Sequence, residues 1–270
     1  MGFSFPFVLH LMLALSAVHL ARFRPELKES YMAQGEHHYG IALRSVIVLL
    51  PRIDAVNCEA MYMSAILICL YKLGRGPQPG EYLAFSDQGD AEWMKLLKGV
   101  RAIAQSKALL LSPGILASVM QAGTHKRKPP VGRKPPPDYQ ENIESLRRFI
   151  TVERAGDPDI ETYIEALDGV AQSFTGFYEG TDGTLGSYHS SFIFAWLYRT
   201  SEDFSLRLRR KEPVALVILA YYTVLLKELD LDWYMSGWVP HIMSGIHHSL
   251  PEDYRIWLQW PMEQTGWNPG

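Results

Sequence analysis

Three acidic residues in the C-terminal half of the chain are the first candidates for chemistry. Glu228, Asp230 and Asp232 lie at alternate positions directly before an aromatic segment. Carboxylates grouped in this way could bind Mg²⁺ and, through it, a diphosphate, as in an all-helical terpene cyclase. Alternate spacing splays the three side chains around a helix, however, and no second acidic motif follows. We therefore favour solvation of a helix end, and a cyclase-like enzyme of a terpenoid pathway with these three catalytic residues remains the alternative.

The histidines give no compact metal site by their spacing. His37-His38 and His247-His248 are adjacent pairs, so the members of each pair point in different directions around a helix. His241 and His248 lie seven positions apart, which is too far for one small site. The sequence also lacks the nucleophile elbow, the phosphate-binding loop and the dinucleotide fingerprint. We expect structural histidines, no bound metal and no cofactor, and an enzymatic function is the less favoured one.

Aromatic residues form the most informative cluster in the sequence. Five of the seven tryptophans fall between Trp233 and the C-terminus. Tryptophan is costly to leave in water, so this segment must be docked on the body of the protein and could line an apolar cavity. Plain core packing explains much of the same pattern. The predicted ligand-binding residues are Tyr221, Tyr222, Trp233, Met235, Trp238, Trp257 and Trp260.

The overall composition argues against a nucleic-acid-binding surface. The 270 residues carry a net charge of −3, with 47% hydrophobic and 20% charged residues. Binding to DNA usually requires a strongly basic face, so we expect no direct DNA binding by this chain. The two cysteines, Cys58 and Cys69, lie about 16 Å apart along a predicted helix, too far for a disulfide. They are predicted to be buried free thiols.

The elements that must position these residues are predicted to be helices. Residues 6–22 and 57–73 are strongly apolar, and residues 213–229 contain an apolar run suited to the centre of a bundle. Residues 93–104 have the spacing of an amphipathic helix, with Asp90 as its expected N-cap. Ser249 and Glu252 match a capping box before a last helix at 254–260. Since strand patterns are nearly absent, we predict an all-α fold, a single multi-helix bundle domain over 1–270.

The N-terminal apolar run, residues 3–21, admits three interpretations. It is apolar on almost every face, which is typical of a helix surrounded by other helices. A targeting segment is the second interpretation, although no basic residue precedes the run. A membrane span is the third, and the run is marginal in length and contains a proline. We favour the buried first helix and expect no stable membrane span.

The clearest break in the helical pattern is the segment 123–138. It is rich in proline, lysine and arginine and contains a single acidic residue. Such a composition cannot pack a core and predicts an exposed, mobile loop. Its basic residues could serve as a nuclear-localisation patch, or they could belong to an ordinary solvated loop. The nucleus or the cytoplasm is the expected location.

Three stretches together resemble the C-terminal regulatory region of fungal zinc binuclear cluster transcription factors. The first is the apolar stretch 7–21 with its Leu-Ser-Ala-x-His-Leu-Ala core. The second is His38-Tyr39-x-x-Ala42-Leu43-Arg44, followed by Asn57-x-x-Ala60. The third is Trp233-x-x-x-Gly237-Trp238 with Trp257-Leu-Gln-Trp260-Pro261-Met262-Glu263-x-x-Gly266-Trp267. The closest branch is that of the sterol uptake control proteins.

This resemblance implies a regulatory domain that senses a sterol or a similarly apolar small molecule. A homodimer or the transcription machinery would be its macromolecular partner. The family's DNA-binding module, six cysteines on two zinc ions, does not occur in these 270 residues. A stand-alone relative of the family, or a protein-interaction module without any ligand, therefore stays open beside the sensor.

Overall fold

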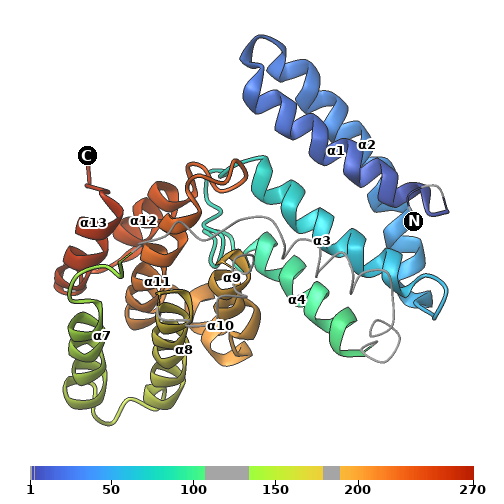
Figure 1. The fold of residues 1–270 in the computed structure, drawn as a ribbon. Helices are drawn as coiled ribbons and strands as arrows, with labels where there is room; N and C mark the ends of the chain where they lie inside the picture. The colour runs from blue at the N-terminus through green and yellow to red at the C-terminus, as the bar shows by residue number, and fades with distance from the viewer. Residues whose placement is uncertain (1, 3, 107–133, 179–188) are drawn as a thin grey trace. The chain divides into compact units, whose positions relative to one another are not determined.

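The computed structural model describes residues 2, 4–106, 134–178 and 189–270 (Figure 1). Within these ranges the chain forms eleven α-helices and no strand, with only isolated β-bridges between residues 78 and 89. The predicted all-α fold is confirmed. Most of the segment 123–138 lies outside the described residues.

The contacts of the chain separate it into two compact units. Unit 1 comprises Met1–Pro77, Glu92–Ala122 and Asp232–Ser236. Unit 2 comprises Gln78–Ala91, Gly123–Leu231 and Gly237–Gly270. Each unit draws on three separate segments of the chain, and each is described on its own below. The single domain over 1–270 stays a prediction.

Unit 1 is built on a helical hairpin. Its helices are α1 (Pro6–Phe23), α2 (Lys28–Leu49), α3 (Cys58–Gly74) and α4 (Glu92–Ser106). Helix α1 packs along α2 and also contacts α3, which packs on α4. Figure 1 shows α1 and α2 lying side by side. Pro6 stands in the first turn of α1, where its missing N–H would have no helical partner.

A ring stack and two hydrogen bonds connect the helices of unit 1. The rings of Tyr39 and Tyr71 stack 4.3 Å apart between α2 and α3. His10 of α1 and His38 of α2 share a hydrogen bond, with 2.9 Å between their Nδ1 atoms. Trp93 of α4 donates its indole N–H to the backbone oxygen of Cys69 at 3.3 Å. These contacts join all four helices of the unit.

Helix α1 differs from the prediction that it would be buried on every side. Its buried residues, Phe7, Val8, Leu11, Ala14, Ala17, Val18 and Ala21, lie on the face turned to α2 and α3. The opposite face exposes large apolar side chains, among them Met12 and Phe23. In the described part of the chain, α1 is the one helix long and apolar enough to cross a membrane, and 39% of it is buried.

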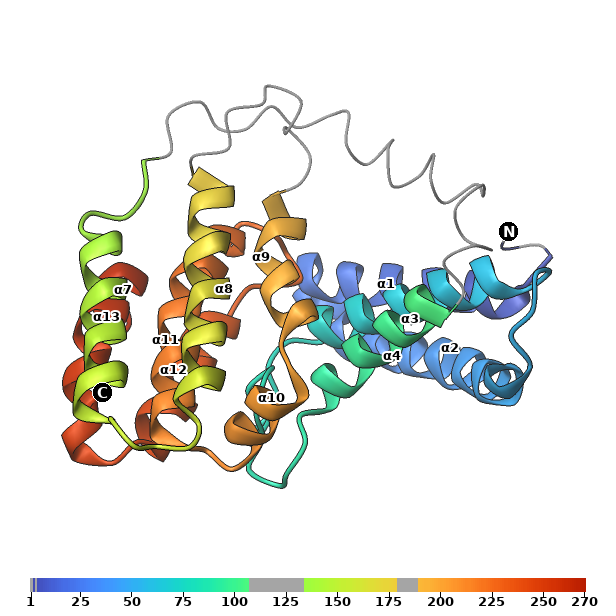
Figure 2. The same cartoon turned by 90° about the horizontal axis from the view of Figure 1, so that it is seen from below.

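Unit 2 gathers its helices around α11 (Pro213–Leu226), as Figures 1 and 2 show. Every residue from Val214 to Leu226 is buried, which agrees with the apolar run read from the sequence. Helix α11 packs against α8, α10, α12 and α13. The helices of unit 2 around it are α7 (Tyr139–Arg148), α8 (Ile160–Tyr178), α9 (His189–Arg199), α10 (Glu202–Arg209), α12 (Trp238–Ser249) and α13 (Gln259–Thr265).

One predicted helix cap is wrong, and the N-cap role of Asp90 stays a prediction. The helix after Asp90 begins at Glu92, and the Asp90 carboxylate pairs with Arg209 at 3.0 Å. Ser249 is the last residue of α12 and does not cap the segment that follows it. Pro251 precedes a 3₁₀ segment over Glu252–Leu258, and the final α-helix starts only at Gln259. Pro251 restricts the backbone where this segment begins. The segment starts with a 3₁₀ turn, whereas a capping box predicts an α-helical turn.

The cysteines agree with their prediction. Cys58 and Cys69 are both free and both buried in α3. Burial raises the pKa of the Cys69 thiol to about 12, so this group stays protonated near neutral pH. A thiol in that state is a weak nucleophile, and it acts here as a small apolar side chain.

Candidate functional site

Unit 2 contains an open groove of about 540 Å³ beside its C-terminal helix. The start of α7, one turn of α11, the 3₁₀ segment and α13 contribute its walls. Figures 1 and 2 both show α7 next to α13. The residues that line the groove are Pro137, Asp138, Asn142, Tyr221, Ile256, Trp257, Gln259, Trp260, Glu263 and Gln264.

Three of the predicted ligand-binding residues form the aromatic part of this groove. The rings of Tyr221 and Trp260 lie 5.1 Å apart, and Trp260 donates its indole N–H to the backbone oxygen of Pro137 at 3.4 Å. Trp257 packs against Phe149 with 4.7 Å between ring centroids. Because each ring is held by another ring or by the backbone, the aromatic surface is set before any ligand arrives.

The short helix α13 contributes four residues to the groove, Gln259, Trp260, Glu263 and Gln264. Trp260 and Pro261 stand in its first turn, where proline is tolerated because the N–H it lacks would have no helical partner. Gly266 ends the helix in the left-handed conformation, with φ of 70°. A helix of seven residues between these two signals turns Trp260 inward and leaves Glu263 at the surface.

The rim of the groove is polar, and none of the residues that line it carries a positive charge. Asp138 and Glu263 supply carboxylates, while Asn142, Gln259 and Gln264 supply amides. Gln259 donates to Glu263 at 3.1 Å, and Asn142 donates to the backbone oxygen of Asp138 at 2.9 Å. These groups can accept a hydrogen bond from a hydroxyl or amino group of a ligand. The sequence analysis missed this rim, since isolated polar residues in a helix give no signal of their own.

The described lining of the groove contains carboxylates and amides but no histidine, cysteine, serine or lysine. Burial raises the pKa of the Tyr221 phenol above its ordinary value, so the ring remains neutral. The accessible lining of the groove is more polar than apolar. Tyr221 and Trp260 expose only 2% and 7% of their surface, so the accessible aromatic surface belongs mainly to Trp257.

The other four predicted ligand-binding residues do not line this groove. Tyr222 is fully buried in unit 2, where its hydroxyl donates to the backbone oxygen of Ile193 at 2.9 Å and its ring lies 4.3 Å from that of Trp196. Trp238 is the first residue of α12 and is 4% exposed. Trp233 and Met235 belong to unit 1.

Trp233 fills a gap between the helices of unit 1. Its ring lies 4.9 Å from His19 and against Gly74, where a Cβ atom would be only 2.8 Å from the indole. Gly74 is therefore required for close approach of the ring. This tryptophan acts as a packing residue of unit 1.

The three acidic residues of the alternative enzyme have separate partners. Glu228 accepts a hydrogen bond from the hydroxyl of Tyr178 at 2.9 Å. Asp230 pairs with Lys227 at 2.9 Å. Asp232 belongs to unit 1 and accepts from Tyr234 at 3.3 Å. Over the described ranges, no three histidine, cysteine or acidic side chains form a group that could hold a metal ion.

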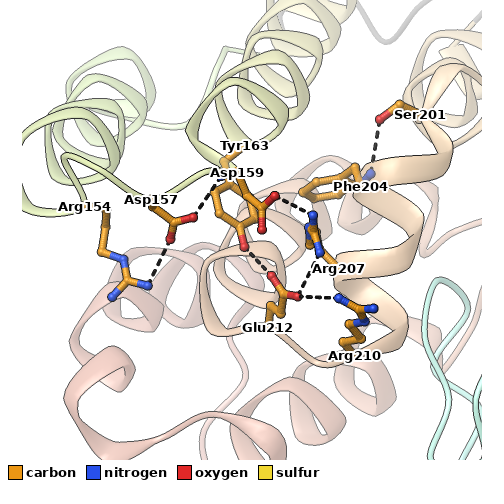
Figure 3. Close-up of polar contacts among 9 residues, drawn as sticks. All are labelled: Arg154, Asp157, Asp159, Tyr163, Ser201, Phe204, Arg207, Arg210 and Glu212. Atoms are coloured by element: carbon orange, nitrogen blue, oxygen red, sulfur yellow. Dashed lines mark hydrogen bonds and ion pairs between the residues drawn. The ribbon is translucent and has the colours of Figure 1, made fainter.

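A network of charged side chains connects α8, α10 and the start of α11 (Figure 3). Arg207 of α10 pairs with Asp159, in the turn before α8, and with Glu212, directly before α11, at 3.4 Å. Tyr163 of α8 donates to Glu212 at 2.5 Å, and this contact and burial raise the pKa of its phenol. The network joins the ends of three helices. None of its members lines the groove beside α13 or the groove between α8 and the α9–α10 turn.

A second groove, of about 490 Å³, runs between α8 and the α9–α10 turn. One side carries Glu161, Glu165 and Asp168, which share a face of α8. Its floor includes Trp196, which lies so close to Gly169 that a Cβ atom there would be 2.8 Å from the indole. Arg147 pairs with Asp168 and Arg199 lines the opposite side, so the acidic charge is partly neutralised.

Comparison with known proteins gives no match. No family model matches the chain, and neither a curated protein nor a solved structure matches it significantly. The geometry of the two units therefore carries the functional argument.

Proposed function

We propose that this chain is a ligand-sensing regulatory domain that binds a sterol or a similarly apolar molecule in the groove at α13. The observation that carries the proposal is the convergence of Tyr221, Trp257 and Trp260 on one groove. These residues come from separate elements of unit 2, and they belong to the aromatic set read from the sequence. The resemblance to regulatory regions of fungal zinc binuclear cluster transcription factors supplies the regulatory role.

The size of the groove supports a ligand of this class. Its volume of about 540 Å³ falls in the range of roughly 300–1,000 Å³ that small-molecule sites occupy. A sterol presents flat apolar rings and one hydroxyl group. The rings suit Trp257 and Trp260, and the hydroxyl can donate to Glu263 or Asp138 at the rim.

Regulation follows from a difference in affinity between two states of the domain. A ligand stabilises the state in which its groove is complete and shifts the population toward that state. The elements around the groove are short, since α13 has seven residues and the 3₁₀ segment also has seven. A small rearrangement of these elements would alter the groove while leaving α11 buried.

Titration of the purified chain with ergosterol tests the proposal. We expect a change in tryptophan emission and a rise in the melting temperature, because a ligand that binds only the native state stabilises it. The variant Trp257→Leu should weaken binding about tenfold, which corresponds to ~1.4 kcal/mol of lost contact. Trp267→Leu removes a tryptophan of the same segment that does not line the groove, and it serves as the matched control.

Two results would argue against the groove as the sensor site. Saturating ergosterol that changes neither emission nor melting temperature would remove the sterol as ligand. Equal weakening by Trp257→Leu and Trp267→Leu would move the site away from α13. An interaction module without ligand would give the first of these results, and a diphosphate-dependent enzyme would need a carboxylate cluster that the described residues do not form.

A further inference from the structure

The exposed face of α1 carries an apolar stripe that nothing in the described part of unit 1 covers. Leu9, Met12, Leu13, Leu20 and Phe23 are between 37% and 63% exposed. In helical projection at 100° per residue they fall within an arc of about 100°. Ser16, also exposed, lies in the same arc. The stripe is continuous over four turns, about 20 Å along the axis.

Few charged residues lie near the stripe, and the first two along the chain are positive. Helix α1 contains no acidic residue, and its charged residue is Arg22 in the last turn. Arg24 follows at the C-cap, and both arginines are exposed. Lys28, Glu26 and Glu29 come next, so the segment 22–29 has a small positive balance. In the same projection Arg24 lies within about 20° of the edge of the stripe, whereas Arg22 lies about 80° from it, toward the buried face.

We propose that the stripe on α1 adsorbs to the surface of an anionic phospholipid membrane. Large exposed apolar patches on soluble domains mark interaction sites. Helix α1 is apolar enough to cross a bilayer, but its inner face packs against α2 and α3. The helix can therefore insert one face into the boundary between headgroups and acyl chains while unit 1 stays folded. Arg24, at the C-terminal end of the stripe, can contact the negative headgroups.

This arrangement would hold the protein at a membrane without a transmembrane span. Binding comes mainly from the leucines and Phe23, whose apolar area leaves water. The arginines add an electrostatic attraction that weakens with salt. The stripe belongs to unit 1 and the groove to unit 2, so this inference does not depend on the proposed ligand.

Sedimentation with sterol-free vesicles tests the inference on the full chain. We expect the protein to bind vesicles of phosphatidylcholine with phosphatidylserine more strongly than vesicles of phosphatidylcholine alone. The double variant Leu13→Glu with Leu20→Glu should lower binding at least about tenfold. Leu231→Glu changes an 87% exposed leucine of unit 2 in the same way and should bind as the unchanged chain does. Circular dichroism and thermal melting show that each variant is folded.

A charge variant separates the two contributions. Arg22→Glu with Arg24→Glu should remove most of the preference for phosphatidylserine, whereas Arg148→Glu with Arg210→Glu, two exposed arginines of unit 2, should leave it in place. Absence of vesicle binding by the unchanged chain would overturn the inference. Light scattering that shows a dimer dissociated by the leucine double variant, without vesicle binding, would instead assign the stripe to a second copy of the chain.

Discussion

Among the described glycines, Gly245 leaves the least room for a side chain. A Cβ atom at this position would lie 2.3 Å from Cδ1 of Tyr82 and 2.7 Å from Cγ. The Tyr82 ring cannot easily move aside, because it stacks on Phe85 at 4.7 Å and on His241 at 4.9 Å. The segment 78–91 is therefore held against α12 through a contact that only glycine allows.

We expect Gly245→Ala to destabilise unit 2. An added methyl group in a packed contact commonly costs about 1–3 kcal/mol, because neighbours must leave their preferred rotamers. Chemical denaturation measures this loss. Gly99→Ala is the matched control, since a Cβ atom on this glycine of α4 meets nothing within 4 Å. The control should be neutral or should stabilise the helix by up to ~1 kcal/mol. A loss of the same size in both variants would contradict the steric explanation.

The His10–His38 hydrogen bond predicts a dependence of stability on pH. One ring must donate and the other accept, so the bond requires at least one neutral imidazole. Burial, and then the neighbouring charges of His10 and His37, lower the pKa of His38. The unfolded chain then binds more protons than the folded chain below the ordinary histidine value of about 6.5. The free energy of unfolding is fully retained above that value and falls as the pH drops through the lowered pKa of His38.

Melting curves between about pH 7.5 and pH 5 measure this effect, since the window begins at the unfolded histidine value. The variant His38→Gln should show a smaller loss of stability toward acid than the unchanged chain. His19→Gln removes another histidine of α1 outside the pair and should retain the full loss. Identical profiles for His38→Gln and the unchanged chain would show that the pair does not control the acid response.

At the scale of elements, the network at Arg207 should determine how α8, α10 and α11 meet. The side chains of Arg207, Asp159 and Glu212 keep 17–26% of their surface exposed. Arg207→Met leaves two carboxylates without their shared partner. We expect a measurable loss of unfolding free energy, smaller than for a fully buried pair because water still screens these charges. Urea denaturation gives the value.

Arg210→Met provides the control for this network. Arg210 lies 4.0 Å from Glu212 and 58% of its side chain is exposed, so its pair contributes little. We expect a change below about 0.5 kcal/mol. If Arg210→Met were as costly as Arg207→Met, the stabilisation would come from general positive charge near Glu212 and not from the joined helix ends.

The helices themselves could be predicted from the sequence to a large extent. The apolar run of α11, the amphipathic spacing of α4 and the prolines at helix starts give local signals. The N-terminal run was harder to interpret, because apolar residues on all faces do not reveal which face stays uncovered. The predicted cap at Ser249 is wrong because this residue still belongs to α12, which the local Ser-x-x-Glu pattern does not reveal.

At the scale of the whole molecule, the candidate site could be predicted only in part. Trp233 and Trp238 stand five positions apart and look like one cluster, yet they belong to different units. Gly237, with φ of 83°, lies at the change between them. Trp257 and Trp260 share the groove with Tyr221, a residue of the central helix. No periodic pattern in the sequence predicts which aromatic residues meet across such distances in the chain. The residues that line the groove could therefore be identified only from the structure.

The charge of the whole chain leads to a prediction about DNA. With a net charge of −3, the 270 residues should bind duplex DNA weakly and without sequence preference. A gel-shift titration at physiological salt should give no specific complex at sub-micromolar protein. Tight, sequence-dependent binding would show that this chain reads DNA without a separate module. Regulation of transcription would otherwise require a DNA-binding module or a partner.

The insertion of Trp233 between the helices of unit 1 has a consequence for the order in which the protein is made. The ribosome releases α1, α2 and α3 early, but the tryptophan that packs on Gly74 follows roughly 160 residues later, or on the order of 10–30 s at typical elongation rates. During this interval the cleft beside Gly74 stands open and α3 lacks its last packing partner. The nascent chain therefore passes through a state that chaperones can bind, and unit 1 is completed only when almost all of the protein has been synthesised.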